Sequence, residues 1–278
     1  MQTSQQAANA LIFRQMHTGD HILLLPNIWD VASARIVEQA GFSAIATSSA
    51  GVAFALGYPD GQKIPAQEML SVVARIAKAV QVPVTADVES GYGDRPEDAA
   101  RTARDVIAAG AVGMNLEDAT HSADSPLRDP QLQVEMIRAV REAAKESGVP
   151  LVLNARTDVF LLEVGEPAAR YDEAIRRLRA YHDAGADCLF LPGVQDAATI
   201  ARAVADLNFP LNILVGPGSP TIPELRKLGV ARVSLGSSPM RAALGVMRRI
   251  AEEVKQSGTY SALEDSPTFA EMNRLMVG

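Results

Sequence analysis

Short apolar segments recur along the chain, and each is followed by a polar or glycine-containing turn and then by a segment with helical spacing. Eight of them are found, at residues 21–27, 43–49, 82–88, 111–118, 150–158, 186–192, 210–216 and 231–237. Each is almost continuously apolar, as in parallel strands that are covered on both faces. The segments between them, for example 65–80 and 95–110, carry apolar residues three and four positions apart, which indicates amphipathic helices.

This alternation of strand and helix predicts the fold. Eight strand–helix units are typical of an α/β protein with a (β/α)₈ barrel, the TIM barrel. A doubly wound sheet is the alternative, but its GxGxxG glycine fingerprint does not occur in the chain. We expect one domain over residues 1–278, with an extra helix in the first 17 residues. A tail over residues 257–278 is expected to contain a short helix near 267–276.

Composition and charge narrow the class of function. The chain has 278 residues, of which 47% are hydrophobic and 21% charged, with a formal net charge of -7. Lys and Arg are scattered, so the sequence lacks the basic patch that binds nucleic acid, and small-molecule chemistry is favoured. The single cysteine, Cys188, excludes an intramolecular disulfide and fits a packed core position. No signal peptide or membrane span is recognised, so we expect a cytoplasmic protein without membrane partners.

Acidic and amide side chains stand at the carboxyl ends of the predicted strands, where the active site of a barrel lies. Residues two positions apart on a strand point to the same side. Asp87 and Glu89 end the third strand, and Asp60 follows the second. Further candidates of this kind end the fourth and fifth strands: Asn115 and Glu117, then Asn154, Arg156 and Asp158.

Three or four carboxylates that meet at one barrel mouth repel one another unless a cation lies among them. Oxygen ligands favour a hard ion, so we expect Mg²⁺, with Mn²⁺ as a substitute. Arg156 offers a planar pair of donors for a substrate carboxylate. A single acidic residue at a strand end is more often a helix cap or part of a surface ion pair than a metal ligand, and it is their occurrence on adjacent strands that favours a metal site. Arg156 could also form a structural ion pair with Glu117 or Asp118, and both roles are compatible.

Among the histidines, His121 is the candidate functional residue. It lies in a glycine-free polar loop directly after the fourth strand, where barrels place residues that face the substrate. With Thr120 it is a candidate proton donor. The other histidines are assigned to a turn or to a solvated helix face: His17, His21 and His182.

Two further features concern ligand binding. Asn212, in the predicted strand 210–216, is a candidate substrate-binding residue. The loops at 216–220 and 235–240 could bind phosphate at a helix N-terminus, although tight turns explain them equally well.

Five segments resemble the isocitrate lyase and phosphoenolpyruvate mutase superfamily in their order and spacing. They are PNIWDVASARIVEQAGFSAIATSSAG, ALGYPDG, VTADVESGYGD, NLEDA and LNARTD. The resemblance covers about residues 20–250, and ADVESGYG is similar to that family's DAD-x-GYG signature, with Glu89 in place of the second aspartate. It implies that Asp87 is the direct magnesium ligand and that Asp60, Glu89 and Glu117 hold its waters.

The resemblance also implies a substrate site and a mode of assembly. Ser48, with the backbone amides of Ser49 and Ala50, would cradle the substrate carboxylate, and Arg156 would bind the substrate. Members of the superfamily form or cleave carbon–carbon or carbon–phosphorus bonds next to the enolate of a 2-oxo acid. Their barrels exchange the eighth helix between subunits, usually in tetramers. A homo-oligomer is therefore expected, either a tetramer or a dimer with an exchanged helix.

Several positions depart from the better known members. The loop 119–129 lacks the K-[KR]-C-G-H sequence of isocitrate and methylisocitrate lyases, and Ala119 replaces the lysine of phosphoenolpyruvate mutase. Ala46 replaces the tryptophan of the mutase. These departures argue against those lyase activities and against phosphonate rearrangement.

The first hypothesis is a magnesium-dependent lyase that cleaves a carbon–carbon bond of a 2-oxo or 2-hydroxy di- or tricarboxylic acid. It would act as a decarboxylase of an oxaloacetate-like acid or as a lyase of a substituted malate or citrate. Arg156, Glu117 and His121 would carry the catalysis, with the loop 119–129 as a lid. The alternatives are a carboxyphosphonoenolpyruvate or phosphonopyruvate mutase, a barrel that binds a 2-oxo acid without catalysis, and a phosphate-binding barrel isomerase.

Overall fold

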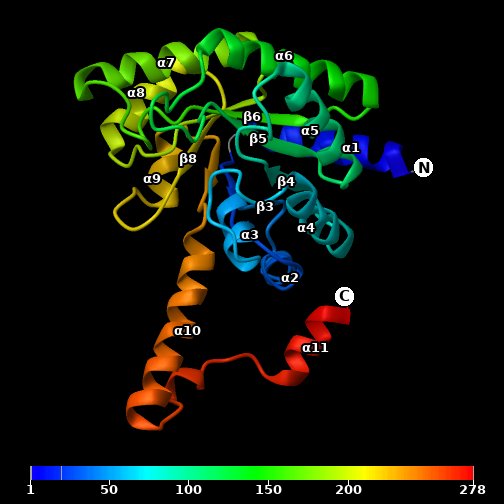
Figure 1. Ribbon diagram of the computed structural model, residues 1–278, viewed down its shortest axis with the longest axis vertical. Helices are drawn as coiled ribbons and strands as arrows, with labels where there is room; N and C mark the ends of the chain where they lie inside the picture. Colours follow the sequence, from blue (N-terminus) through cyan, green and yellow to red (C-terminus); the bar gives the residue numbers. More distant parts are fainter. Residues whose placement is uncertain (1, 20, 278) are drawn as a thin grey trace.

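The computed structural model describes residues 2–19 and 21–277, with residues 2 and 3 described by their backbone alone (Figure 1). The described residues contain nine strands, hydrogen-bonded in the order β1-β9-β8-β7-β6-β5-β4-β3-β2. All neighbouring strands are parallel. The strands are β1 (Leu23–Leu25), β2 (Asn27–Ile28), β3 (Ile45–Thr47), β4 (Val84–Asp87), β5 (Gly113–Glu117), β6 (Val152–Arg156), β7 (Cys188–Phe190), β8 (Leu211–Leu214) and β9 (Arg232–Ser234).

The first predicted strand, residues 21–27, is divided into two pieces. β1 pairs with β9 and β2 pairs with β3, so together they close the sheet into a barrel. Pro26 lies between the pieces and has no N–H to donate to a ladder, which explains the interruption. The prediction of an α/β TIM barrel is confirmed. A single domain over residues 1–278 stays a prediction, and residues 1, 20 and 278 lie outside the described part.

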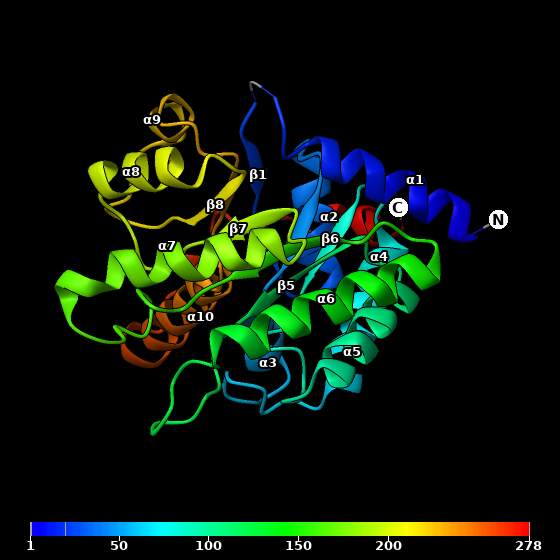
Figure 2. The same ribbon diagram turned by 90° about the horizontal axis from the view of Figure 1, so that it is seen from above.

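Helices alternate with the strands, and most of them lie around the barrel (Figures 1 and 2). They are α2 (Val31–Gln39), α3 (Ser49–Ala55), α4 (Ala66–Ala79), α5 (Pro96–Ala108), α6 (Pro130–Ser147), α7 (Pro167–Asp183), α8 (Ala197–Leu207), α9 (Ile222–Lys227) and α10 (Ser238–Ser257). Many begin at a recognisable signal in the sequence: Asp30 and Asp196 accept hydrogen bonds at the starts of α2 and α8, and proline opens α5, α6 and α7. Such residues satisfy or replace the first free N–H groups of a helix.

The extra N-terminal helix, α1 (Gln2–Gln15), closes the base of the barrel. Its Phe13 is fully buried, and a Cβ atom added to Gly113 at the start of β5 would lie 2.8 Å from the Phe13 ring. A glycine is therefore needed where the ring enters. His17, just after the helix, is buried as well. Cys188 lies fully buried in β7, and burial raises the pKa of its thiol to about 12, as expected for a packed core residue.

The C-terminal part leaves the barrel. α10 extends away from it (Figure 1), and Met240 is the residue of this helix that is buried. A short 3₁₀ helix, η1 (Ser261–Leu263), and α11 (Phe269–Val277) follow, close to the predicted helix at 267–276. α11 lies against α2, where Arg35 Nη1 donates to Leu275 O at 2.6 Å. Within residues 2–19 and 21–277, none of the helices combines the length and apolar character needed to cross a bilayer.

Candidate active site at the barrel mouth

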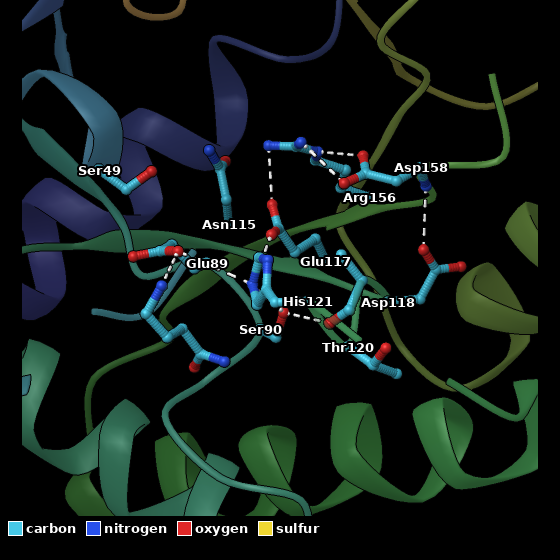
Figure 3. Close-up of polar contacts among 12 residues, drawn as sticks. Ser49, Glu89, Ser90, Asn115, Glu117, Asp118, Thr120, His121, Arg156 and Asp158 are labelled. Atoms are coloured by element: carbon cyan, nitrogen blue, oxygen red, sulfur yellow. Dashed lines mark hydrogen bonds and ion pairs between the residues drawn. The ribbon is translucent and has the colours of Figure 1, made fainter. Parts of the chain in front are cut away.

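Buried acidic side chains gather at the carboxyl ends of β4 and β5. Glu89 and Glu117 are 2% and 4% exposed. His121 Nε2 lies 3.7 Å from Glu89 Oε2 and 3.5 Å from Glu117 Oε1, and Figure 3 shows Glu117 between His121 and Arg156. One ligand atom from each of Glu89, Glu117 and His121 lies within 4.8 Å of the other two, close enough to share one metal ion.

The position of Glu89 depends on a turn and not on the alternation of a strand. β4 ends at Asp87, and Glu89 has a φ of 52°, in the left-handed region that non-glycine residues rarely adopt. Gln62 N donates to Glu89 Oε2 at 2.5 Å, and Gln62 Oε1 accepts from Tyr92 N. Gln62 therefore holds the turn and the carboxylate together.

Asp87 is held by three donors. Its Oδ2 accepts from the backbone N–H of Ser49 at 3.0 Å and from Ser49 Oγ at 2.7 Å. Its Oδ1 accepts from Asn115 Nδ2 at 3.3 Å. A carboxylate has about four lone-pair positions, so these contacts leave one for a further partner.

The electrostatics of the mouth favour a bound cation. Burial, together with the charges of Asp60 and Asp87, raises the pKa of Glu89 to about 7. Burial also raises the pKa of Glu117, against the opposing charge of Arg156. At the exposed rim, partial desolvation and the charge of Asp87 raise the pKa of Asp60. Glu89 Oε1 is buried without a hydrogen-bond partner in the described residues. The carboxylate oxygens of this cluster therefore fit a divalent metal ion.

Arg156, at the end of β6, is fixed by acidic neighbours. Its Nη1 lies 2.7 Å from Glu117 Oε2, and its Nε and Nη2 contact the two oxygens of Asp158 at 2.5 and 2.8 Å. The guanidinium also lies over the ring of Phe190, 5.6 Å from its centre. Of the two ion pairs that the sequence left open for Arg156, the one with Glu117 is present, whereas Asp118 pairs with Arg177. Arginine has five N–H donors, so the three acidic contacts leave two for a ligand.

Asp118 organises the wall behind these residues. It is fully buried and accepts from Tyr181 OH at 2.7 Å and from Arg177 Nη1 at 3.1 Å, both on α7. It also accepts from Thr157 Oγ1 and from the backbone N–H of Asp158. Asp118 therefore anchors the segment that carries Arg156 and Asp158. This role of Asp118 was not predicted from the sequence, although the Glu-Asp pair at the end of β5 is a signal for it.

The loop 119–129 carries His121 over the acidic cluster. Ala119 and Leu127 form an antiparallel bridge, and His121 has a φ of 58°. The hydroxyl of Ser90 donates to Ala119 O and lies 3.2 Å from His121 Nε2. Since this hydroxyl hydrogen is committed to Ala119, Nε2 of a neutral His121 is the donor toward Ser90. Burial lowers the pKa of His121, which favours the neutral imidazole.

The remaining candidates are placed as follows. Ser48 Oγ accepts from Gly51 N at 3.1 Å and so caps α3. Ser49 donates to Asp87, and Ala50 lies in the first turn of α3. Asn212, a candidate substrate-binding residue, is fully buried in β8. Its amide donates to Ser234 Oγ at 3.3 Å inside the barrel.

Solved structures and curated sequences resemble the chain over nearly its whole length. A crystal structure from Burkholderia cenocepacia J2315, described only as a lyase or mutase, is 40% identical, with a TM-score of 0.93 over 99% of this chain and 98% of the other. A structure of oxaloacetate acetylhydrolase with the product oxalate is 27% identical, with a TM-score of 0.86 over 96% and 93%.

Two curated enzymes extend the comparison. The 2-methylisocitrate lyase of Escherichia coli is 28% identical over 91% of this chain and 87% of its own. The oxaloacetate decarboxylase of Rhodopseudomonas palustris is 29% identical over 95% and 91%. The family model described as phosphoenolpyruvate phosphomutase matches residues 13–255. With a closed barrel and an acidic mouth at its strand ends, the chain belongs to the phosphoenolpyruvate phosphomutase family.

Proposed function

We propose that the protein is a divalent-metal-dependent lyase that cleaves a carbon–carbon bond of a small 2-oxo or 2-hydroxy carboxylate. An oxaloacetate-like acid is the first candidate substrate. The observation that carries this proposal is the buried cluster of Glu89 and Glu117 beside Asp87, with the guanidinium of Arg156 in contact with it. The acidic side chains suit a cation, and the guanidinium suits a substrate anion. Relatives named oxaloacetate decarboxylase and oxaloacetate acetylhydrolase support the substrate class.

The donor set fits Mg²⁺, with Mn²⁺ as a substitute, because carboxylate oxygens are the ligands that these ions prefer. Asp87 would hold the ion directly, as the family signature implies, and Asp60, Glu89 and Glu117 would bind its water ligands. When bound, such an ion stabilises negative charge that develops on substrate oxygens.

The protein's own side chains would bind and orient the substrate. Arg156 retains two N–H donors after its contacts with Glu117 and Asp158, and these would hold a substrate carboxylate. Ser48 and the backbone amides of Ser49 and Ala50 would complete the cradle, as the family resemblance implies.

A proton must reach the carbon that loses its leaving group, and the loop 119–129 offers a donor. His121 Nε2, which carries the hydrogen of the neutral ring, lies 3.5 Å from Glu117 Oε1, so the imidazole would offer a proton beside the acidic cluster. Thr120 is the neighbouring alternative. The loop would exclude water when it closes as a lid.

The test is the exchange of pyruvate methyl protons with solvent deuterium, followed by NMR in the presence of Mg²⁺. The wild-type protein should catalyse exchange, whereas Asp87→Ala should reduce it by at least about 100-fold, because each 1.4 kcal/mol of lost stabilisation costs tenfold in rate. Asp183→Ala, which removes a carboxylate that is 78% exposed on α7, is the matched control. Exchange that survives both a chelator and Asp87→Ala would contradict the proposal.

A panel of 2-oxo and 2-hydroxy diacids, with oxaloacetate first, tests the substrate class. Turnover with release of carbon dioxide would support the decarboxylase form of the proposal. Tight binding of a 2-oxo acid without product from any member of the panel would favour a binding protein instead.

A further inference from the structure

The middle of the barrel contains a buried cation. Arg232, at the start of β9, is 1% exposed, in a place where barrels of this type usually hold branched apolar side chains. Its Nη1 lies 3.4 Å from His17 Nε2, and its Nη2 donates to Asn115 Oδ1 at 3.3 Å. Among the described residues, no carboxylate lies within 4.0 Å of this guanidinium. Burying an unpaired charge is costly, so its presence calls for an explanation.

The amide of Asn115 connects Arg232 to the mouth of the barrel. Asn115 Oδ1 accepts from Arg232 Nη2 and from Asn154 Nδ2, the latter at 2.8 Å. Its Nδ2 donates to Asp87 Oδ1 at 3.3 Å. Arginine has donors and no acceptor, so only the oxygen of the amide can face Arg232. The NH₂ group must then face Asp87. Asn154 cannot impose this orientation on Asn115, because its own amide could turn to offer either its NH₂ group or its oxygen.

The other side of the guanidinium is fixed by His17. His17 Nδ1 lies 2.9 Å from Phe13 O, and a carbonyl oxygen only accepts, so Nδ1 carries the ring hydrogen. Nε2 is then an acceptor, as its contact with Arg232 Nη1 requires. Burial, reinforced by the charge of Arg232, lowers the pKa of His17 to about 3, so the ring stays neutral. The pKa of Arg232 is lowered by burial to about 10, which leaves the guanidinium charged at neutral pH.

We propose that Arg232 is a positioning residue for the divalent-metal site, which acts through Asn115 to hold the carboxylate of Asp87 in place. The polar path runs from Phe13 O through His17, Arg232 and Asn115 to Asp87, so the helix that closes the base of the barrel is linked to its mouth. This inference rests on the proposed metal at Asp87. Without Arg232, Asn115 Oδ1 would lose one of its two donors, so the amide would be held less firmly and its contact with Asp87 Oδ1 would weaken.

The experiment measures Mn²⁺ and Mg²⁺ binding to the purified full chain by calorimetry and by Mn²⁺ electron paramagnetic resonance. Arg232→Met should weaken binding by about 10- to 100-fold, the usual effect of losing a residue that orients a metal ligand. Asn115→Leu should weaken it similarly. The double variant should bind no more weakly than Asn115→Leu alone, because an effect carried through Asn115 is not additive with its removal.

Two further variants separate orientation from general damage to the fold. Arg232→Lys keeps a donor for Asn115 and should restore binding to within about tenfold of wild type. Arg141→Met is the matched control, because it removes a largely buried arginine and its 2.8 Å ion pair with Asp187 away from the mouth. Its metal affinity should equal that of wild type, whatever the loss in thermal stability.

The possible results distinguish a failure of this inference from a failure of the proposed function. Wild-type binding with unchanged affinity in Arg232→Met would overturn the inference and leave the proposed function intact. Effects of Arg232→Met and Asn115→Leu that multiply in the double variant would show that Asn115 does not carry the effect, which also overturns it. If Arg232→Met does not fold, Arg232→Lys takes its place in the test. A folded Arg232→Lys that binds metal as weakly as Asn115→Leu would overturn the inference. Failure of the wild-type chain to bind either ion would overturn the proposed function and this inference together.

Discussion

Glu89 shows what one residue contributes to the acidic mouth. Its left-handed backbone, with φ at 52°, costs on the order of 1–3 kcal/mol in a non-glycine residue. The contact with Gln62 N holds that conformation and brings the carboxylate toward Glu117 and His121. Burial and the charges of Asp60 and Asp87 raise its pKa to about 7. A proton on this side chain would therefore weaken the binding of a hydrated metal ion near neutral pH.

This effect predicts a pH dependence of metal binding. Because the charged form of Glu89 favours a hydrated cation at the site, Mg²⁺ affinity should rise with pH, by up to about tenfold per pH unit below pH 7, and level off above pH 8. Calorimetry at pH 6, 7 and 8 measures it. Glu89→Gln removes the titrating group, so its weaker binding should change less over this range. Equal pH dependence in both proteins would refute the assignment.

His17 predicts a pH dependence of folding. Its pKa is about 3 in the folded protein and 6.5 for a free histidine, so between these values the unfolded chain binds more protons. Stability therefore increases with pH across this window. The contribution is complete above about pH 6.5 and is lost as the pH falls toward 3. At roughly 1.4 kcal/mol per pKa unit, about 3 kcal/mol would be lost by pH 4.5.

Urea unfolding at pH 7 and pH 4.5 checks this effect. Other groups titrate in the same range, so the quantity of interest is the difference between wild type and His17→Gln. The variant should lose about 3 kcal/mol less than wild type between the two pH values. Identical losses would show that His17 is not buried in neutral form.

Among the elements, α1 shows how a segment outside the barrel becomes part of its core. Phe13 and Ala10 are fully buried, whereas Leu11 on the same helix is 49% exposed. Phe13 enters the base of the barrel beside Gly113, and His17 beyond it reaches Arg232. The helix therefore closes the barrel and supports its polar interior.

Phe13→Ala should consequently lower the free energy of unfolding by about 3–5 kcal/mol, the usual cost of truncating a buried phenylalanine. Leu11→Ala, on the exposed face, should change it by less than about 1 kcal/mol. Urea unfolding at pH 7 measures both. A Phe13→Ala variant as stable as Leu11→Ala would mean that α1 does not plug the barrel.

For the whole molecule, α10 is the helix that suggests contact with a second chain. α10 extends away from the barrel (Figure 1), and Leu244, Met247 and Val254 on it are 48%, 61% and 46% exposed. These residues recur at helical spacing and so form an apolar stripe. A second copy of the chain would cover this stripe, as in the family's exchanged eighth helix.

We therefore expect a homo-oligomer, a tetramer or a dimer, in sedimentation equilibrium. The double substitution Leu244→Lys and Met247→Lys should reduce the mass toward that of one chain, because it buries charges at the contact. Glu252→Gln, a change from one polar side chain to another on the same helix, is the control. A wild-type protein that sediments as a single chain would exclude assembly through α10.

Much of the fold could be predicted from the sequence, because it depends on local pattern. Continuous apolar segments alternating with amphipathic ones indicate covered parallel strands and outer helices, and the structure has them. The acidic and amide residues at the strand ends were predicted to meet, because parallel strands in a barrel end at one face. Glu89, Glu117 and Arg156 do meet there. Their roles with metal and substrate stay predictions.

Other features were decided only in three dimensions. The left-handed turn at Glu89 depends on Gln62, whose backbone N–H lies opposite the carboxylate in the folded protein. The path from His17 through Arg232 to Asn115 joins residues 215 and 117 positions apart, and no local pattern links them. Sequence periodicity shows which face of a strand is inside. Which polar groups meet there depends on how the barrel closes.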